Sequence, residues 1–564
     1  MIEHRSPISG VAAHRDRWVA TAGYDNQVIL WDARTKTAVA RACHDHLANQ
    51  CRFSPDGRLL VTASSDYTAR LWAVPTLRLL AVFGDHEDDV EMAALSPSGQ
   101  HVATASRDHL VRIFALDGPL LAKLGGHTAD VISVDWTADG RHVLSSGDDG
   151  TVRRWDPQKH AGALLETIDL GGVETDTVVA ADDGQLFVGT DEGQILRVAG
   201  SAIAGRHACH AAGIKRLVYD RAGRRLLSAS YDRTIKVWDV TPGGALALAQ
   251  AAPAPPEVWL RSAAFLDGTR LAFGSFGSAY ATYDLERRTW DLAKVGTTAG
   301  INAVCVAEGA VLTVGDAGLV HADGRVIAAL GSLCNFLVPF GPTVLTGGQL
   351  GILFDARTGQ ALYQHRSPLN CGAVFRDQGR ERVVIGTYTG EGLVFGRDAG
   401  GAIELVATVA LHDNAVKGVA ASATELFSVC ATGTAASFAI DGLAPITRVP
   451  AAHDRIANGA VALPEGRFAS VSRDRTLRLW GRGGQRERAV PTPHTHSIKC
   501  LAAQGTLIAT AAYDGAVAVY DWRADRFVHE ERPTTAGISS LCADPRTTGF
   551  LASSYDGHVY RITP

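Results

Sequence analysis

The chain has 564 residues, 46% of them hydrophobic and 20% charged, and this is enough to bury more than one hydrophobic core. Its net charge of -5 excludes the basic excess that is typical of broad nucleic-acid-binding surfaces, so no nucleic-acid partner is expected. No run approaches the roughly 18 apolar residues of a membrane helix, and no apolar segment of signal-peptide length opens the chain. Nine cysteines without a C-x-x-C pair indicate reduced thiols, so we expect a cytoplasmic protein.

A repeating unit of about 41 residues starts at the beginning of the chain and returns to its end. Its most regular mark is a histidine, which occupies the same position of the pattern at His4, His44, His86, His127, His210, His412, His453 and His494. The intervals are 40, 42 and 41 residues at the start and 41 and 41 at the end, and the two long intervals of 83 and 202 residues span two and five repeats. An excess of arginine over lysine and a high alanine content favour a bacterial coding sequence.

Each repeat predicts four short strands. In the fourth repeat these are residues 131–136, 142–146, 152–156 and 164–168, separated by turns such as Asp148-Asp149-Gly150. No segment longer than a turn has helical periodicity, so the chain is predicted to be all-β. Second strands are expected in fourteen repeats, near Val19, Leu60, Val102, Val143, Leu186, Leu226, Leu271, Val311, Val344, Val383, Leu426, Phe468, Leu507 and Phe550. The proline-rich segment 249–256 favours an extended connector.

The best repeats resemble the WD40-repeat family. The resemblance rests on Gly126-His127, on Trp-Asp pairs such as Trp155-Asp156 and Trp238-Asp239, and on a serine four residues before an aspartate, as in Ser145 and Asp149. It weakens in repeats five and seven to eleven. Because propellers of this family usually have seven blades, the resemblance implies two tandem seven-bladed β-propellers with about 14 four-stranded blades, over residues 1–295 and 296–564.

The resemblance also implies a hydrogen-bonded tetrad of histidine, serine or threonine, aspartate and tryptophan within a blade. A buried aspartate needs such partners, and we therefore interpret these residues as structural. The expected tetrads are His4, Thr21, Asp25 and Trp31; His44, Thr62, Asp66 and Trp72; His127, Ser145, Asp149 and Trp155; His210, Ser228, Asp232 and Trp238; and His453, Ser470, Asp474 and Trp480. Two variants are expected, at His86, Thr104 and Asp108 with Phe114 and at His494, Thr510 and Asp514 with Tyr520.

Two positions of the repeat are expected at one rim of each ring: the residue before the tetrad aspartate and the residue five after the tetrad histidine. In the tenth repeat the second of these is assigned to Cys371, whereas the ninth repeat is too degenerate to assign. The partner-binding candidates at the two positions are Tyr24, Arg107, Tyr231, Lys215, Arg261, Lys417, Arg473, Lys499, Tyr513 and Tyr555. Tyrosine and arginine carry much of the energy of protein interfaces, although ordinary turn residues with solvated tips explain them equally well.

The predicted function is a non-catalytic scaffold that presents its rims and loops to partner proteins. The hypothesis for the second ring is that an acidic or phosphorylated segment binds to Lys417, Lys499, Arg473, Tyr513 and Tyr555. A second partner hypothesis is a strand added to the last blade, whose fourth strand is not found before residue 564. The alternatives are a sensor of ligands or modified peptides in a central channel and, less favoured, a propeller enzyme.

No cofactor, metal or membrane partner is expected. Three groups of histidines and cysteines invite a zinc interpretation, namely Cys43/His44/His46/Cys51, His207/Cys209/His210 and His494/His496/Cys500. However, one histidine of each group already belongs to a tetrad, and the spacing of the groups is not constant.

Overall fold

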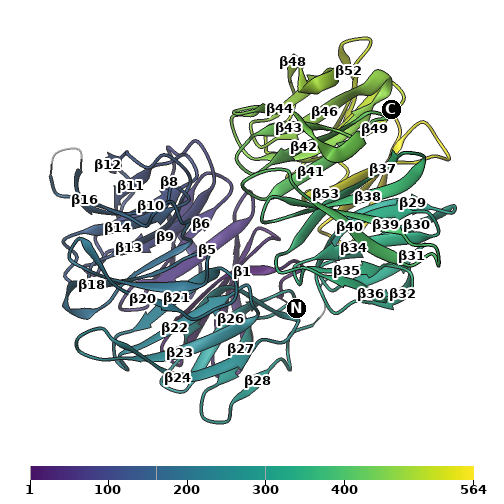
Figure 1. Cartoon of the computed structure of the whole chain (residues 1–564). Helices are drawn as coiled ribbons and strands as arrows, with labels where there is room; N and C mark the ends of the chain where they lie inside the picture. Colours follow the sequence, from purple (N-terminus) through teal and green to yellow (C-terminus); the bar gives the residue numbers. More distant parts are fainter. Residues whose placement is uncertain (1, 160–161, 297, 299) are drawn as a thin grey trace. The chain divides into compact units, whose positions relative to one another are not determined.

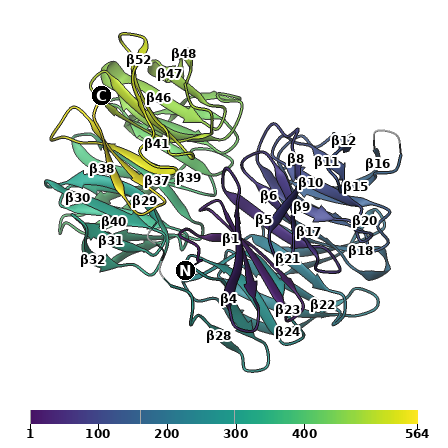
Figure 2. The same ribbon diagram turned by 180° about the vertical axis from the view of Figure 1, so that it is seen from behind.

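The computed structural model describes residues 2–159, 162–296, 298 and 300–564, and the chain divides into two compact units, Met1–Thr298 and Ala299–Pro564. The described residues form 55 strands in fourteen antiparallel sheets, seven in each unit. Within each unit the sheets follow one another around a ring in chain order (Figure 1), and the same order is visible from behind (Figure 2). The predicted fold class of two tandem seven-bladed propellers is confirmed.

The first unit contains blades one to seven, each a four-stranded meander. Their strands are β1 (Ile8–His14), β2 (Trp18–Gly23), β3 (Gln27–Asp32), β4 (Thr37–Cys43), β5 (Ala48–Phe53), β6 (Leu59–Ser64), β7 (Ala69–Ala73), β8 (Arg78–Phe83), β9 (Val90–Leu95), β10 (His101–Ser106), β11 (Val111–Ala115), β12 (Leu120–Leu124), β13 (Val131–Trp136), β14 (Val143–Gly147), β15 (Thr151–Asp156), β16 (Ala163–Asp169), β17 (Thr177–Ala180), β18 (Gln185–Gly189), β19 (Gln194–Ala199), β20 (Ala202–Ala208), β21 (Ile214–Asp220), β22 (Arg225–Ser230), β23 (Thr234–Val240), β24 (Leu246–Pro253), β25 (Val258–Phe265), β26 (Arg270–Ser275), β27 (Ala281–Asp284) and β28 (Thr289–Asp291).

The second unit contains blades eight to fourteen. Their strands are β29 (Ile301–Ala307), β30 (Ala310–Gly315), β31 (Leu319–Ala322), β32 (Arg325–Ala329), β33 (Cys334–Phe340), β34 (Thr343–Gly348), β35 (Ile352–Asp355), β36 (Ala361–Gln364), β37 (Leu369–Asp377), β38 (Arg380–Thr387), β39 (Glu391–Arg397), β40 (Ile403–Ala410), β41 (Val416–Ala421), β42 (Glu425–Cys430), β43 (Ala435–Ala439), β44 (Pro445–Val449), β45 (Ala457–Leu463), β46 (Arg467–Ser472), β47 (Thr476–Trp480), β48 (Arg486–Pro491), β49 (Ile498–Gln504), β50 (Leu507–Ala512), β51 (Val517–Asp521), β52 (Arg526–Glu531), β53 (Ile538–Ala543), β54 (Phe550–Ser554) and β55 (Val559–Ile562).

The described helices are four single 3₁₀ turns, η1 (Asp182–Gly184), η2 (Asp441–Leu443), η3 (Pro464–Gly466) and η4 (Arg482–Gly484). Among the described residues, no helix is long and apolar enough to span a membrane.

The inner three strands of a blade are buried because apolar side chains of neighbouring blades pack between the sheets. In β2 every residue after Trp18 is buried, whereas the outermost strand β4 alternates exposed and half-buried residues with a period of two. One of the clusters between blades joins Phe83 of blade two to Phe114 of blade three, with ring centroids 5.2 Å apart. The core of each ring is therefore a series of interfaces between blades.

Packing of first against last blade closes each ring. In the first unit β1 lies against β25 and β26, and the Val11 amide donates to the Ser262 hydroxyl at 2.9 Å. In the second unit β29 lies against β53 and β54. Each sheet is built from consecutive strands, and the fourteenth contains the three strands β53, β54 and β55.

The segment 249–256 is mostly strand, so the predicted connector is wrong. Most of it belongs to β24, in which Pro253 lies opposite Thr234 of β23. β24 is the outer edge strand of its blade, where a proline without an N–H group can be accommodated.

A β-bulge follows the first residue pair of the innermost strand in most blades. In β13, for example, the pairing shifts between Val131 and Ser133, which leaves Ile132 unpaired. Twelve blades have such a shift. In the seventh blade the shift lies between Trp259 and Ala263 and leaves three residues unpaired, among them Arg261. In the fifth the strand begins at Thr177, directly after Asp176. A bulge redirects one side chain out of the sheet, and this makes the site described below.

Candidate functional site

The blades with a full tetrad contain a continuous hydrogen-bonded chain from the turn to the sheet. In blade four, Nδ1 of His127 lies 2.9 Å from Asp149 and Nε2 lies 2.8 Å from the Ser145 hydroxyl, to which the Trp155 indole N–H also donates at 2.8 Å. The corresponding contacts join the other four sets, which are His4, Thr21, Asp25 and Trp31; His44, Thr62, Asp66 and Trp72; His210, Ser228, Asp232 and Trp238; and His453, Ser470, Asp474 and Trp480.

The hydroxyl and indole groups of the tetrads lie inside the blades and are not part of a binding surface. In blade two, the Trp72 indole N–H donates to the Thr62 hydroxyl at 2.8 Å, and these residues are 4% and 0% exposed. The hydroxyls of Ser228 in blade six and Ser470 in blade twelve lie 2.8 Å and 2.7 Å from the tetrad histidine of their blade, and both serines are fully buried. Thr62, Trp72, Ser228 and Ser470 therefore cannot contact a partner, and their contacts hold the strands of the blade together.

The tetrad keeps its aspartate ionised although the site is buried. Burial raises the pKa of Asp149, but hydrogen bonds from His127, Thr151 and the Thr128 amide outweigh it and hold the pKa below the usual value. These contacts fix the turn between the second and third strands of the blade.

Two blades use a different set of partners. In blade three, the His86 ring lies 3.2 Å from the Thr104 hydroxyl, while the Arg112 guanidinium stands between His86 and Asp108. Burial and the charge of Arg112 lower the pKa of His86 to about 3. In blade thirteen, His494 contacts Thr510 at 2.9 Å, but the Asp514 carboxylate pairs with His496 at 3.1 Å.

The fixed turn presents one residue of every blade at the same place, which we call the turn position. Its backbone N–H donates to a carbonyl just ahead of the innermost strand, as Tyr513 N–H does to Ser497. The turn positions are Tyr24, Ser65, Arg107, Asp148, Asp191, Tyr231 and Phe276 in the first unit, and Asp316, Gln349, Tyr388, Ala431, Arg473, Tyr513 and Tyr555 in the second.

The residue left unpaired by the bulge lies near the turn position, and we call its place the bulge position. The bulge positions are Ser9, Asn49, Glu91, Ile132, Asp176, Lys215 and Arg261 in the first unit, and Asn302, Asn335, Asn370, Lys417, Asn458, Lys499 and Ser539 in the second. We call the turn and bulge positions of one unit its mouth.

One bulge position differs from the sequence assignment, and one was left unassigned. In the tenth blade the position belongs to Asn370, because Cys371 pairs with Gly386 inside the ladder. In the ninth blade it belongs to Asn335. Both asparagine amides donate to the first residue of the next innermost strand, Asn370 to Val416 at 2.7 Å and Asn335 to Leu369 at 3.0 Å. This bond to the neighbouring blade explains why asparagine recurs at the bulge.

The cations of the first mouth are paired with carboxylates. Arg107 contacts Glu91 at 2.6 Å and Asp130 at 2.5 Å, and Arg261 shares Glu91 at 2.9 Å. The Tyr24 ring meets the edge of Trp259 beside this network, with centroids 5.2 Å apart. Three of the predicted partner-binding residues of the first ring thus lie in one partly buried cluster.

Lys215 of the first mouth is enclosed by two further carboxylates. Its ammonium contacts Asp176 and, at 2.9 Å, Asp191, and it lies 4.7 Å from the centre of the Tyr231 ring. Burial, together with the charges of Asp176 and Asp130, raises the pKa of Asp148 well above its usual value. The first mouth therefore has more carboxylates than it can pair with its own cations.

The second mouth surrounds its cations with aromatic rings. Lys417 lies 4.5 Å from the centre of Tyr388, and the Tyr513 ring is approached by Lys499 at 5.8 Å and by Arg473 at 5.9 Å. In the part of the chain that the structure describes, no carboxylate lies within ion-pair distance of Lys499. Tyr513 and Tyr555 raise the pKa of Lys499, so its charge is retained.

One carboxyl group, that of Asp316, occupies a turn position of the second mouth. It is buried, accepts a hydrogen bond from Asn302 at 2.9 Å on one oxygen, and has no partner in the described chain for the other. Burial raises the pKa of Asp316 to about 7. The residue carries only a partial negative charge at neutral pH.

Sequence analysis missed six turn positions, Asp191, Phe276, Asp316, Gln349, Tyr388 and Ala431, because their repeats lack the tetrad aspartate that marked the others. Extending the period of about 41 residues through the degenerate repeats could have located them.

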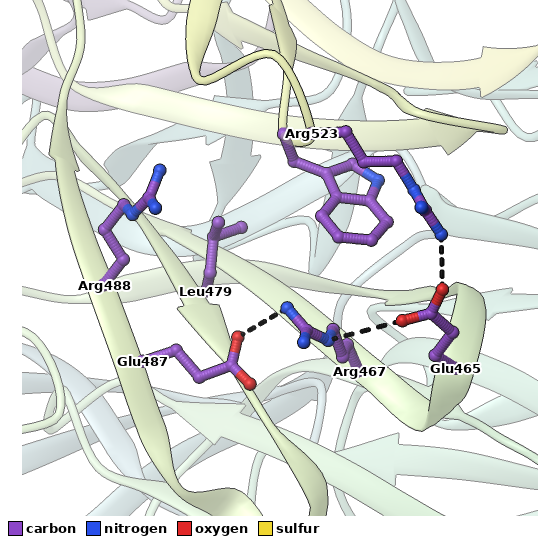
Figure 3. Close-up of a pocket in the computed structure, with 7 residues that line it drawn as sticks. Glu465, Arg467, Leu479, Glu487, Arg488 and Arg523 are labelled. Atoms are coloured by element: carbon purple, nitrogen blue, oxygen red, sulfur yellow. Dashed lines mark hydrogen bonds and ion pairs between the residues drawn. The ribbon is translucent and has the colours of Figure 1, made fainter.

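A hollow of about 410 Å³ lies between blades twelve and thirteen, outside the mouth (Figure 3). Its side chains pair with one another: Arg467 contacts Glu487 at 3.0 Å and Glu465 at 4.0 Å, and Arg523 pairs with Glu465. Because these charges are satisfied internally, we do not assign a ligand to this hollow.

Among the described residues no group of three or more histidine, cysteine, aspartate or glutamate side chains is arranged to hold a metal ion. In the three groups that invited a zinc interpretation, His44, His210 and His494 each face a serine or threonine hydroxyl within a blade.

Comparison with known proteins identifies the repeats of the first unit. Residues 1–32, 39–73, 77–114, 118–156 and 204–239 match the family model "WD domain, G-beta repeat". These segments cover blades one to four and six, which are the blades of this unit that have a tetrad histidine.

The curated relatives include a WD repeat-containing protein. Periodic tryptophan protein 2 of Arabidopsis thaliana is 28% identical over 226 residues, which cover 38% of this chain and 20% of the relative. WD repeat-containing protein 37 of Mus musculus is 26% identical over 258 residues, covering 42% and 49%. Ribosome biogenesis protein YTM1 of Kluyveromyces lactis is 25% identical over 225 residues, covering 40% and 42%. The chain spans less than half the length of these relatives, and the five matched segments of its first unit are WD40 repeats.

Proposed function

We propose that the protein is a non-catalytic scaffold or adaptor that holds partner proteins at its propeller mouths. The similarity to WD-repeat proteins supports this proposal, and one of these relatives is named for ribosome biogenesis. Two rings also allow bivalent binding, in which the second contact is strengthened by the first. All nine cysteines are free thiols, which fits the cytoplasmic location that we propose with this function.

The observation that carries the proposal furthest is the environment of Lys499. Lys215, Lys417 and Lys499 occupy the same position of the repeat, and the blade before each of them provides different neighbours. Lys215 is neutralised by Asp176 and Asp191, whereas the corresponding residues before Lys499 are Asn458 and Arg473. Because no carboxylate of the described residues lies within ion-pair distance of Lys499, its ammonium attracts an anion from outside.

We therefore propose that the second mouth binds an acidic or phosphorylated segment of a partner. Lys417, Arg473 and Lys499 supply three positive charges, which match a doubly charged phosphate better than a single carboxylate. Tyr555 is half-buried and provides rigid aromatic surface for the flanking residues, whereas Tyr513 is 6% exposed and supports the cations from beneath.

The test is a fluorescence-anisotropy titration with a phosphoserine peptide that contains acidic flanking residues, and with its unphosphorylated form. The wild type is expected to bind the phosphopeptide more tightly, and Lys417→Glu/Lys499→Glu to lose at least 100-fold in affinity. Arg58→Glu/Lys123→Glu changes the net charge equally at exposed residues outside the mouth and should bind like the wild type.

Equal affinity of the wild type and Lys417→Glu/Lys499→Glu would contradict the proposal, as would an equal loss in the exposed-residue control. Affinity purification from the native host with the same variants then identifies the partner. If the wild type and both variants recover the same stoichiometric protein, that partner binds to a surface other than the second mouth.

The three-stranded last blade supports a second mode of binding. β55 is the outer strand of its sheet, and an outer strand offers N–H and C=O groups for β-augmentation. We propose that an extended partner segment pairs with Val559–Ile562. Hydrogen exchange with and without the purified partner tests this, because strand addition should slow exchange of these amides and unchanged exchange would contradict it.

A further inference from the structure

The centre of the first ring contains a buried guanidinium that shares its nearest carboxylate, Asp135, with a second guanidinium. One residue after the bulge position, the innermost strands of this unit carry Gly10, Gln50, Met92, Ser133, Thr177, Arg216 and Ser262. The equivalent residues of the second unit are Ala303, Phe336, Cys371, Gly418, Gly459, Cys500 and Ser540. Arg216 is the one charged residue at these fourteen places.

Arg216 reaches from blade six to blade three and remains buried. It lies on β21 of blade six, and one terminal nitrogen is 3.8 Å from the sulfur of Met92 on β9 of blade three. The residue is 7% exposed, and its Nε has no hydrogen-bond partner in the described chain. Within those residues no carboxylate comes within ion-pair distance of its guanidinium.

The surrounding side chains leave a net positive charge. Arg52 pairs with Asp135 at 2.8 Å, and the second oxygen of Asp135 accepts the Ala180 amide at 3.2 Å. Burial and the charge of Arg52 lower the pKa of Arg216 to about 9 and outweigh the opposite influence of Asp135, and Arg216 is still protonated at neutral pH. Burial raises the pKa of the nearby Cys51 thiol to about 12, so this group is neutral. Two guanidinium groups therefore face one carboxylate.

An uncompensated buried guanidinium is strongly unfavourable, and retained charges of this kind are normally paired. Thioether sulfur is a weak acceptor and cannot neutralise it. We propose that Arg216, together with Arg52, binds a small inorganic anion of the size of chloride or orthophosphate in the channel of the first propeller. This site is separate from the mouths and does not depend on the proposed scaffold function.

The first test measures how the melting temperature of the first unit changes within the full chain. The protein is kept in sodium gluconate, and chloride or orthophosphate is added at constant ionic strength. A bound ligand raises the stability of the folded state in a saturable way. The wild type should show such a rise, and Arg216→Met should not, while melting at a higher temperature than the wild type in gluconate alone. Arg58→Met removes an exposed guanidinium and should behave like the wild type.

A direct measurement keeps the proposal testable if Arg216→Met does not fold. Bromide-soaked crystals of the wild type should show an anomalous peak beside the Arg216 guanidinium. Absence of that peak, or equal responses of the wild type and Arg216→Met to both anions, would overturn the proposal.

Discussion

The two mouths are built from the same backbone positions but surround their cations differently, with carboxylates in the first and aromatic rings in the second. In the first, Lys215 and Arg107 are held by carboxylates of neighbouring blades, and Asp148 adds a further acidic group. In the second, Lys417 and Lys499 lie against tyrosine rings. The difference shows that a residue type at a given repeat position does not define a binding site. The side chains of the preceding blade decide whether a lysine contacts carboxylates or aromatic rings.

The largest effect that we expect concerns Asp316, the carboxyl group of the second mouth. Its pKa is raised from 3.8 in the unfolded chain to about 7, so the folded state loses stability through this group as pH rises across that interval. Asp316→Asn removes the dependence and should be more stable than the wild type by up to about 4 kcal/mol at pH 8, with little difference below pH 4. Urea unfolding at several pH values measures this, and a constant difference between the two proteins would contradict it.

The second-largest effect that we expect is a difference in stability between lysine variants of the two mouths. Lys215→Met leaves Asp176 and Asp191 uncompensated beside Asp148 and is expected to destabilise the first unit by about 3 kcal/mol. Lys499→Met removes a charge that has no ion pair and should change the second unit by less than about 1 kcal/mol. Urea denaturation of both variants checks the contrast, which would be broken by equal losses.

Exchanging the neighbours should exchange the properties of the mouths. Asp176→Asn/Asp191→Asn frees Lys215 and should strengthen binding of the acidic phosphopeptide to the first mouth by about tenfold, or about 1.4 kcal/mol. In the second mouth, Asn458→Asp places a carboxylate near Lys499 and should weaken binding by a similar factor. Anisotropy titrations in the Lys417→Glu/Lys499→Glu background isolate the first mouth, and no gain there would show that Lys215 is inaccessible.

The smallest effect concerns the ring beneath Lys499. Tyr513→Leu removes the cation–π contact that orients the ammonium and should reduce phosphopeptide affinity about threefold, or about 0.7 kcal/mol. Tyr513→Phe keeps the aromatic face and should bind nearly as the wild type does. An equal loss in both variants would assign the effect to the hydroxyl group instead.

The period of the tetrad residues was sufficient to predict the blades. The four strands expected in the fourth repeat agree with β13 to β16 within one residue at each end, because turns such as Asp148-Asp149-Gly150 limit where pairing can begin. Degenerate repeats were harder. A bulge shifts the register by one residue without changing the hydrophobic pattern around it, so Cys371 was assigned the place that Asn370 occupies.

Contacts between blades could not be predicted at all. The pairing of Lys215 with Asp176 and Asp191 joins residues of adjacent blades, and Arg216 reaches Met92 across the channel. Sequence spacing gives the position of each residue within its blade, but the direction of a long side chain depends on packing around the ring. The insertion of Arg112 between His86 and Asp108 was missed for the same reason.

The recurring bulge separates the part of a blade that must stay constant from the part that is free to vary. Its residue takes no part in the ladder, so Ser9, Glu91, Ile132 and Lys499 are all tolerated at one backbone geometry. Each ring therefore presents seven bulge side chains on a constant backbone. Single substitutions at these positions can change the binding surface while the strand pairing is kept. A new specificity can therefore evolve without a step through an unfolded ancestor.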